Sequence, residues 1–169
     1  MTRRMNLTKE QFVERYGGIY EHSPWVAEQC YPQVDDAKNL ADVFAACVDA
    51  AEYDARLMLI RAHPDLAGRA AVAGELTVES TSEQASAGIA QCTPEEFDRF
   101  VSFNDRYKKK FGFPFVMAVR NSNRHEILAA FEHRIENDEA DEFATAMFEI
   151  HKIARLRLEA LSAHEQHRK

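Results

Sequence analysis

Residues 93–112, TPEEFDRFVSFNDRYKKKFG, carry the clearest helix signal in the sequence. Thr93 is a typical N-cap residue, Pro94 suits the first helical position, and Glu96 completes a capping box. Gly112 is the usual kind of residue at a helix C-terminus. Between these ends the apolar residues follow at helical spacing, at Phe97, Phe100, Val101 and Tyr107. The stretch therefore predicts one long amphipathic helix.

Outward from this helix, apolar residues repeat at helical spacing along most of the chain. Further helices are predicted from N-cap residues or from the first residue of an apolar helical pattern. They start at or near Thr8, Ser23, Leu40, Tyr53, Ser80, Asn123 and Phe143. Thr8 with Gln11 is a second capping box, and Ser23 followed by Pro24 is an expected N-cap. The interval 65–79 contains glycines and has weak periodicity, which indicates a loop.

Only residues 113–120, FPFVMAVR, look extended. A single strand has no partner with which to form a sheet, so a sheet is not expected. The chain length is typical of one domain, and 46% hydrophobic residues can form a substantial core. We therefore predict an all-α protein with a single domain over residues 1–169. Its architecture should be a bundle of about seven to eight helices with one ordered extended loop.

The charge balance argues against nucleic acid and membrane partners. The formal net charge is −7, whereas nucleic acids and anionic membranes select clustered Lys and Arg. The short run Lys108–Lys110 is the main basic cluster. It is most simply a solvated last helical turn, where cations suit the helix dipole. No window approaches the ~18 apolar residues of a membrane span.

Cysteine usage and the chain ends indicate the compartment. Cys30, Cys47 and Cys92 are odd in number and lack CxxC spacing, which suits reduced thiols better than a disulfide framework or a zinc site. The N-terminal residues lack an apolar stretch of signal-peptide length, and the C-terminal HEQHRK carries no recognisable address. We therefore expect a cytoplasmic protein.

The first candidate functional residue is His63, in RAHPDL at residues 61–66. Pro64 disfavours the α region for the residue before it, so His63 should leave the preceding helix and place its imidazole at a helix end. An imidazole titrates near neutrality and can act as an acid or a base.

A second candidate site lies in STSEQASAG, residues 80–88. Ser80, Glu83 and Gln84 stand at i, i+3 and i+4, which puts their polar side chains on one helical face. The small residues that follow would let a ligand or another helix approach closely. Ser80-x-x-Glu83 is also a capping-box pattern, and spacing alone favours the cap over a ligand role.

The extended segment is a third candidate. Its backbone N–H groups lack intrahelical partners and must be satisfied by neighbours, water or a ligand. Arg120 at its end could hold an anion through two hydrogen bonds. The alternative is that Phe115 and Val116 are ordinary core residues and that Arg120 pairs with a surface carboxylate.

A metal site is poorly supported by the sequence. The seven histidines form neither HExxH nor a Cys/His cluster, and His151 is better explained as a partly buried helix residue than as a ligand. P-loop, GxGxxG and GxSxG motifs are also lacking. The residues alone therefore predict a helical domain without naming its reaction.

Four motifs taken together resemble one known family. They are SPW at 23–25, HPDLAGRAA at 63–71, STSEQASAG at 80–88 and KKFGFPFVMAVR at 109–120. In this order and spacing they resemble the 2-oxo-4-hydroxy-4-carboxy-5-ureidoimidazoline (OHCU) decarboxylases of purine catabolism. The resemblance spans nearly the whole chain. It implies an all-helical, cofactor-independent homodimer that converts OHCU into (S)-allantoin and CO₂, the third step of urate degradation.

The resemblance also implies a site. It makes His63 the catalytic histidine, with Pro64 fixing its turn, and it assigns Glu83 to the same catalytic group. The remaining residues that it places against the substrate are Ser80, Gln84, Phe115, Val116 and Arg120, where the two loop residues act through their backbone amides. No metal is implied.

Two rival functions remain at this stage. A non-catalytic helical module could bind a small anion or a partner protein through His63, Arg120 and an apolar cleft. A metal-dependent hydrolase is the other rival. An activity assay, rather than the sequence, distinguishes these two functions from a decarboxylase.

Overall fold

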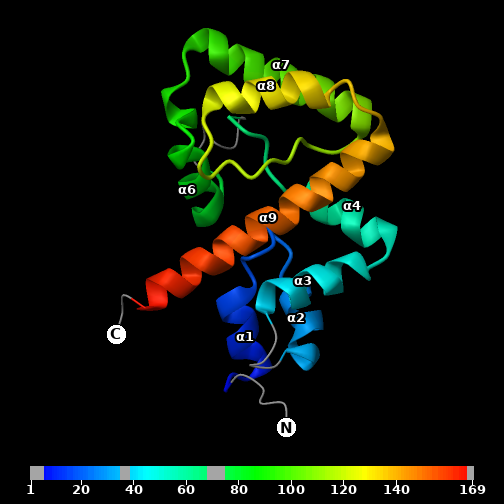
Figure 1. Cartoon of the computed structure of the whole chain (residues 1–169), viewed down its shortest axis with the longest axis vertical. Coiled ribbons are helices and arrows are strands. Elements are labelled where there is room, and N and C mark those ends of the chain that lie inside the picture. Colours follow the sequence, from blue (N-terminus) through cyan, green and yellow to red (C-terminus); the bar gives the residue numbers. More distant parts are fainter. Residues whose placement is uncertain (1–5, 35–38, 68–74, 167–169) are drawn as a thin grey trace. The chain divides into compact units, whose positions relative to one another are not determined.

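The computed structural model describes residues 6–34, 39–67 and 75–166, and these residues form an all-α protein (Figure 1). They contain eight α-helices and two short 3₁₀-helices, and no strand occurs among them. The predicted fold class is therefore confirmed. The loop expected at 65–79 falls partly on residues 68–74, which lie outside the described residues.

The chain divides into two compact units, which we describe separately. The first comprises the residues up to 62 and those from 151 onward, and the second comprises residues 63–150. Helix α9, Glu139–Gln166, contributes its N-terminal part to the second unit and its C-terminal part to the first. A single domain over residues 1–169 stays a prediction.

The first unit contains four complete α-helices beside its part of α9. They are α1 (Lys9–Tyr16), α2 (Trp25–Cys30), α3 (Leu40–Asp49) and α4 (Tyr53–Arg61), with the 3₁₀-helix η1 (Tyr31–Gln33) directly after α2. Thr8 and Gln11 form the predicted capping box of α1. Phe12 of α1 and Phe44 of α3 are buried with their ring centroids 6.0 Å apart. The apolar spacing thus marks faces that are buried in this unit.

The start of α2 differs from the prediction. The helix begins at Trp25, Pro24 occupies the N-cap position, and no side chain caps this helix. Pro24 already has helical backbone angles, so the Ser23 hydroxyl is left for the preceding turn, where it donates to the backbone oxygen of Glu21 at 2.8 Å. The buried carboxylate of Glu21 pairs with Arg157 of α9 at 2.7 Å.

A hydrogen-bonded chain of three side chains also lies in the first unit. The Tyr20 hydroxyl is 2.9 Å from Nδ1 of His151, and Nε2 of His151 is 2.9 Å from Oδ1 of Asp49. Burial, and then the neighbouring Cys30 and Asp49, raises the pKa of the Tyr20 phenol. His151 is half-buried on α9, which confirms its expected place as a partly buried helix residue.

The second unit consists of three complete α-helices and the start of α9. The complete helices are α6 (Val78–Ser86), α7 (Pro94–Phe111) and α8 (Arg124–Arg134), and the 3₁₀-helix η2 (Ile89–Gln91) precedes α7. Aromatic rings form its core. Phe115, from the segment between α7 and α8, stacks on Phe131 of α8 with centroids 3.7 Å apart. Tyr107 of α7 meets both rings edge-on.

Helix α7 begins and ends as the sequence predicts. Thr93 and Glu96 form the capping box, and Gly112 ends the helix with a left-handed φ of 78°. The buried face is partly different, because Phe97 and Val101 are only half-buried. The face is instead made by Phe100, Phe103, Asn104, Tyr107 and Phe111. These positions form one continuous stripe at i, i+3, i+4, i+7 and i+11.

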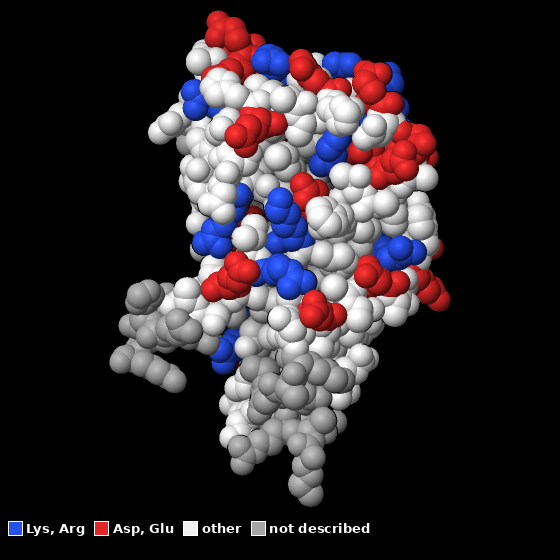
Figure 2. All heavy atoms as spheres, viewed as in Figure 1, with Lys and Arg blue, Asp and Glu red and all other residues white. Residues whose placement is uncertain are grey.

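Charged side chains of both signs share the surface. On the face that Figure 2 shows, Lys and Arg lie beside Asp and Glu over the described residues. The face is therefore mixed in charge. Within the described ranges, no helix is both long and apolar enough to cross a membrane.

The acid sensitivity of the protein should depend on Glu96. Its pKa lies below the usual value for a glutamate, first because it accepts a hydrogen bond from the Thr93 backbone N–H, and then because Arg124 lies 3.0 Å away. A carboxylate whose pKa falls on folding stabilises the protein above its unfolded-state pKa. This contribution is lost as the pH falls through the folded-state value.

We therefore expect Glu96→Gln to lower the free energy of unfolding at neutral pH and to flatten its decline on acidification, as measured by urea titrations across the carboxylate range. The exposed neighbour provides the control, Glu95→Gln. Identical acid profiles for Glu96→Gln and the wild type would contradict this role.

Candidate active site

His63 lies in a turn directly after α4. The helix ends at Arg61, and the proline ring of Pro64 disfavours helical angles for His63. His63 is buried, with 8% of its surface exposed. The expected placement of the imidazole just beyond a helix end is confirmed, and its burial limits contact with bulk water.

Side chains from α6 and α7 hold the backbone just after the His–Pro pair. Gln84 of α6 accepts a hydrogen bond from the Ala67 N–H at 3.1 Å, and its Nε2 donates to the Asp65 carbonyl at 3.3 Å. The buried Asn104 of α7 donates to the Leu66 carbonyl at 2.9 Å. Three consecutive residues are thus each fixed by a side chain from elsewhere in the second unit.

The conformation of Ala67 shows why this turn needs support. Its φ is +53°, in the left-handed region that a residue with a Cβ adopts only at a cost of about 1 kcal/mol or more. The hydrogen bond to Gln84 offsets this strain. Lys108 adds a further anchor, because its Nζ lies 2.7 Å from Oδ2 of Asp65. The sequence suggested that the lysine run at the end of α7 is simply solvated. Lys108 instead forms an ion pair with Asp65.

Helix α6 corrects one interpretation of the sequence. The helix begins at Val78, and its N-cap is Thr77, whose side chain accepts from the Ser80 backbone N–H at 3.1 Å. Ser80 is therefore inside the first turn, and the capping box of Ser80 with Glu83 is wrong. The cap signal was real, but it belongs to the threonine three residues earlier.

The same helix places the predicted binding residues on one face. Ser80 and Gln84 are buried, and Glu83 is half-buried. Gln84 uses both ends of its amide on the backbone of the His63 turn. The half-buried carboxylate of Glu83 is the group on this face that remains partly accessible. Gly88 follows α6 with φ 75°, and a Cβ there would lie 3.5 Å from Nη1 of Arg124.

The segment between α7 and α8 is not helical, as predicted, and most of it is buried. Phe115 and Val116 are 1% and 2% exposed, so their side chains belong to the core, as the alternative interpretation had it. This placement leaves only their backbone groups available for contacts with a ligand. Arg120 is exposed in the turn that leads into α8.

A buried ionic cluster fixes this segment. Arg134 of α8 donates through Nη1 to the Val116 carbonyl at 2.8 Å, and its guanidinium lies over the Phe115 ring at 4.2 Å. Its Nε donates to Oε1 of Glu142 at 2.9 Å. Glu142, at the start of α9, is fully buried and also accepts from Tyr107 at 2.6 Å. Burial, and then the hydrogen bond to Glu142, raises the pKa of the Tyr107 phenol.

Sequence reasoning missed Arg134, Glu142 and Asn104. A signal was present, since each is a polar residue in a buried helical register. Glu142 precedes Ala146 and Ile150 at i+4 and i+8, all of them buried. This spacing indicates a buried charge only when that face of the helix is known to be buried. Opposite charges on the buried faces of two helices then suggest an ion pair.

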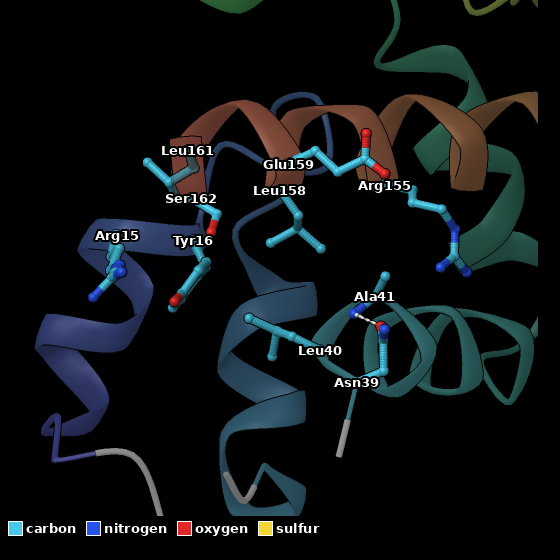
Figure 3. A pocket seen from close by; sticks show the side chains of 10 residues that line it. All are labelled: Arg15, Tyr16, Asn39, Leu40, Ala41, Arg155, Leu158, Glu159, Leu161 and Ser162. Carbon is cyan, nitrogen blue, oxygen red and sulfur yellow. Dashed lines mark hydrogen bonds between the residues drawn. The ribbon is translucent and has the colours of Figure 1, made fainter. Parts of the chain in front are cut away.

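Within the described parts of the chain, no group of three or more His, Cys, Asp and Glu side chains could hold a metal ion. The first unit has a surface hollow of about 350 Å³ beside Arg15, Leu40 and Arg155 (Figure 3). None of the predicted site residues lines it.

The fold and this site define a small all-helical protein in which a buried histidine sits in a braced turn, an arrangement suited to acid–base chemistry. The family model for OHCU decarboxylase matches residues 5–159. The chain belongs to the OHCU decarboxylase family, which confirms the resemblance seen in its motifs.

Individual relatives agree. The 2-oxo-4-hydroxy-4-carboxy-5-ureidoimidazoline decarboxylase of Haloferax volcanii is 42% identical over 157 residues, covering 90% of this chain and 89% of that protein. The mouse (Mus musculus) protein of the same name is 36% identical over 157 residues, covering 91% and 88%. A crystal structure of (S)-allantoin synthase matches with a TM-score of 0.72 and 32% identity. That match covers 92% of this chain but only 50% of the solved one.

We expect the pairing of Arg134 with Glu142 to dominate the stability of the second unit. Arg134→Met should cost about 3–5 kcal/mol in free energy of unfolding, because it leaves a buried carboxylate without its counter-charge. Adding Glu142→Gln should recover much of that loss, since the unpaired charge is then gone. Urea unfolding of the two variants measures both effects.

The exposed pair of Arg99 and Glu132, 3.2 Å apart, is the matched control. Arg99→Met should cost about 1 kcal/mol at most. Additive losses in the Arg134→Met and Glu142→Gln double variant would show that the two side chains do not act as a pair.

Proposed function

We propose that this protein decarboxylates OHCU to (S)-allantoin and CO₂, as a cofactor-independent carboxy-lyase in the third step of urate degradation. Family membership over residues 5–159 and relatives of that name at 42% and 36% identity support the reaction. The structural observation that supports a catalytic role for His63 is its burial in a turn that Gln84 and Asn104 hold in place.

The proposed chemistry draws its electron sink from the substrate. The substrate carbon that bears the carboxylate and the hydroxyl adjoins a ring C=N bond. When the bond to the carboxylate breaks, CO₂ leaves and the electron pair moves toward that C=N bond. His63 hydrogen-bonds or deprotonates the hydroxyl at this step, as a general base. Protonation of the ring from one face then sets the (S) configuration.

The other predicted residues orient the substrate in this proposal. Glu83, partly accessible on α6, accepts hydrogen bonds from the ureido and ring N–H groups, with Ser80 beside it on the same face. Gln84 holds the His63 turn through both ends of its amide, and an N–H that remains can still reach the substrate.

Arg120 and the loop backbone meet the anionic part of the substrate. The exposed guanidinium of Arg120 suits a carboxylate or a ring oxygen that gains charge. The backbone amides near Phe115 and Val116 act as fixed donors, an oxyanion-type contribution. Pro64 serves by keeping the histidine turn rigid.

We also propose that the protein is a cytoplasmic homodimer. The three cysteines are free thiols, which suits a reducing compartment. Phe148 of α9 is 69% exposed in the single chain, a large apolar side chain that a second copy could cover.

A non-catalytic module that binds a small anion or a protein is the rival. The assay that separates the two supplies freshly generated OHCU and follows its decay by ultraviolet absorption and circular dichroism. Acceleration above the spontaneous rate, with only (S)-allantoin formed, supports the enzyme. Activity that survives a chelator excludes a metal-dependent hydrolase.

His63→Ala should lower the enzyme-catalysed rate by about 10²–10⁴, the usual contribution of a positioned acid–base group. Glu83→Gln should also lower the rate while leaving the melting temperature nearly unchanged, because Thr77 rather than Ser80 caps α6. The enzyme-catalysed rate is the rate of OHCU decay followed by circular dichroism, minus the spontaneous rate in buffer alone.

The matched controls are His133→Ala, on an exposed face of α8, and Glu79→Gln, exposed on α6. Both should keep wild-type rates. Near-normal decarboxylation by His63→Ala would remove that residue from the mechanism.

The oligomeric state has its own test. Light scattering coupled to size exclusion should give twice the 19.3 kDa mass of the chain. Phe148→Ser should shift the distribution toward the single chain if α9 lies in the interface. A wild-type mass of one chain across the concentration range would contradict the homodimer.

A further inference from the structure

Two cysteines meet where α2 and α3 pack together in the first unit. Cys30 is the last residue of α2 and is fully buried. Cys47 lies in the last turn of α3 and is half-buried. Both thiols are free in the structure.

Each thiol contacts an oxygen on the segment that carries the other cysteine: Cys30 contacts α3, and Cys47 contacts η1, directly after α2. The Cys30 thiol donates to the Val43 carbonyl on α3, with the sulfur 3.9 Å from the oxygen. Val43 precedes Cys47 by one helical turn. The Cys47 thiol in turn donates to Oε1 of Gln33, at 3.8 Å, in the turn that follows Cys30. Each sulfur thus contacts a residue three or four positions along the chain from the other cysteine.

The pKa values of nearby groups respond to both cysteines. Burial raises the pKa of the Cys30 thiol, and a side-chain hydrogen bond with Cys47 raises it further. The Tyr20 phenol lies close enough for both cysteines to raise its pKa, after burial and together with Asp49. Both cysteines therefore contribute to the raised pKa of the same buried phenol.

We propose that Cys30 and Cys47 form a reversible oxidation site, at which a peroxide converts the two thiols into a disulfide. The Cys47 sulfur attacks one oxygen of hydrogen peroxide and becomes a sulfenic acid, while the O–O bond breaks and the other oxygen leaves as hydroxide, which takes up the proton of the Cys47 thiol to give water. The Cys30 sulfur then attacks the Cys47 sulfur and displaces a second water, which takes up the Cys30 proton. Two thiols are oxidised and one peroxide is reduced to two waters.

The two cysteines have unequal tasks because their exposure differs. Cys47 is the half-buried one and meets the peroxide first, since reactivity follows access and thiolate character. Cys30 is fully buried and acts as the resolving thiol. A surface hollow of about 340 Å³ is lined in part by Gln33 and Val43, the residues whose oxygens the two thiols contact, so a small oxidant can come next to these contacts.

Cys92 provides an internal comparison in the second unit. Burial, and then Glu96, raises the pKa of its thiol, which disfavours the reactive thiolate. Peroxide should therefore spare Cys92 at doses that link Cys30 to Cys47.

The test treats the reduced, folded, full-length protein with graded hydrogen peroxide, quenches it, and alkylates the remaining thiols in denaturant. Intact mass and peptide mapping then identify the products. We expect a loss of the mass of two hydrogen atoms, one alkylated cysteine in place of three, and a peptide that joins Cys30 to Cys47. A reductant should restore all three thiols.

Three variants sharpen the result. Cys92→Ser should form the disulfide like the wild type, whereas Cys47→Ser should not form it. Cys30→Ala should leave Cys47 to gain oxygen instead, and circular dichroism checks that this buried change still folds. Because the readout is covalent mass and needs no substrate, it stands independently of the proposed decarboxylase function.

The proposal is overturned if Cys92 is oxidised before the pair, or if wild-type Cys47 accumulates oxygen without linking to Cys30. It is equally overturned if both thiols survive peroxide doses that fully oxidise free glutathione in the same tube.

Discussion

The buried carboxylate of Glu142 is the constraint on which the second unit depends. A charge without solvent must be met by a counter-charge and by hydrogen-bond donors, or the helix that carries it cannot pack. Arg134, Tyr107 and Asn137 supply these donors, from α8, from α7 and from the turn before α9. Because Arg134 also holds the Val116 carbonyl, the same requirement that joins the helices also orders the extended segment between two of them. A packing requirement thus orders the segment whose backbone amides we propose to face the substrate.

The His63 turn is held differently. Hydrogen bonds with Gln84 and Asn104 hold three successive backbone groups, and Lys108 adds an ion pair with the side chain of Asp65. A catalytic imidazole gains from such rigidity, because acid–base efficiency depends on a maintained geometry. Gln84 braces this turn through both ends of its amide, and it is also one of the residues that we propose to bind the substrate.

Local patterns in the sequence were sufficient for the helices and for some of their caps. The capping boxes at Thr8 and Thr93 and the stop at Gly112 are short-range hydrogen-bond and backbone preferences, so a few residues determine them. Thr77 was overlooked because Ser80 offered the same pattern three residues later. The partners of Glu142 lie up to 35 residues away in the chain, and no local rule specifies them. The roles of the site residues came from the likeness of four motifs to a family, since helical spacing alone could not distinguish a ligand contact from a cap.

The positive φ of Ala67 bears on the order in which the chain folds. In an unfolded chain this residue prefers other backbone angles, and its stabilising partner lies 17 residues further along the sequence. The left-handed geometry can persist only after Gln84 of α6 and Asn104 of α7 have reached the turn, so segments far apart in the chain must come together first. Maturation of the histidine turn is thereby a late event, and a nascent chain lacking α7 would hold its imidazole in a fluctuating loop.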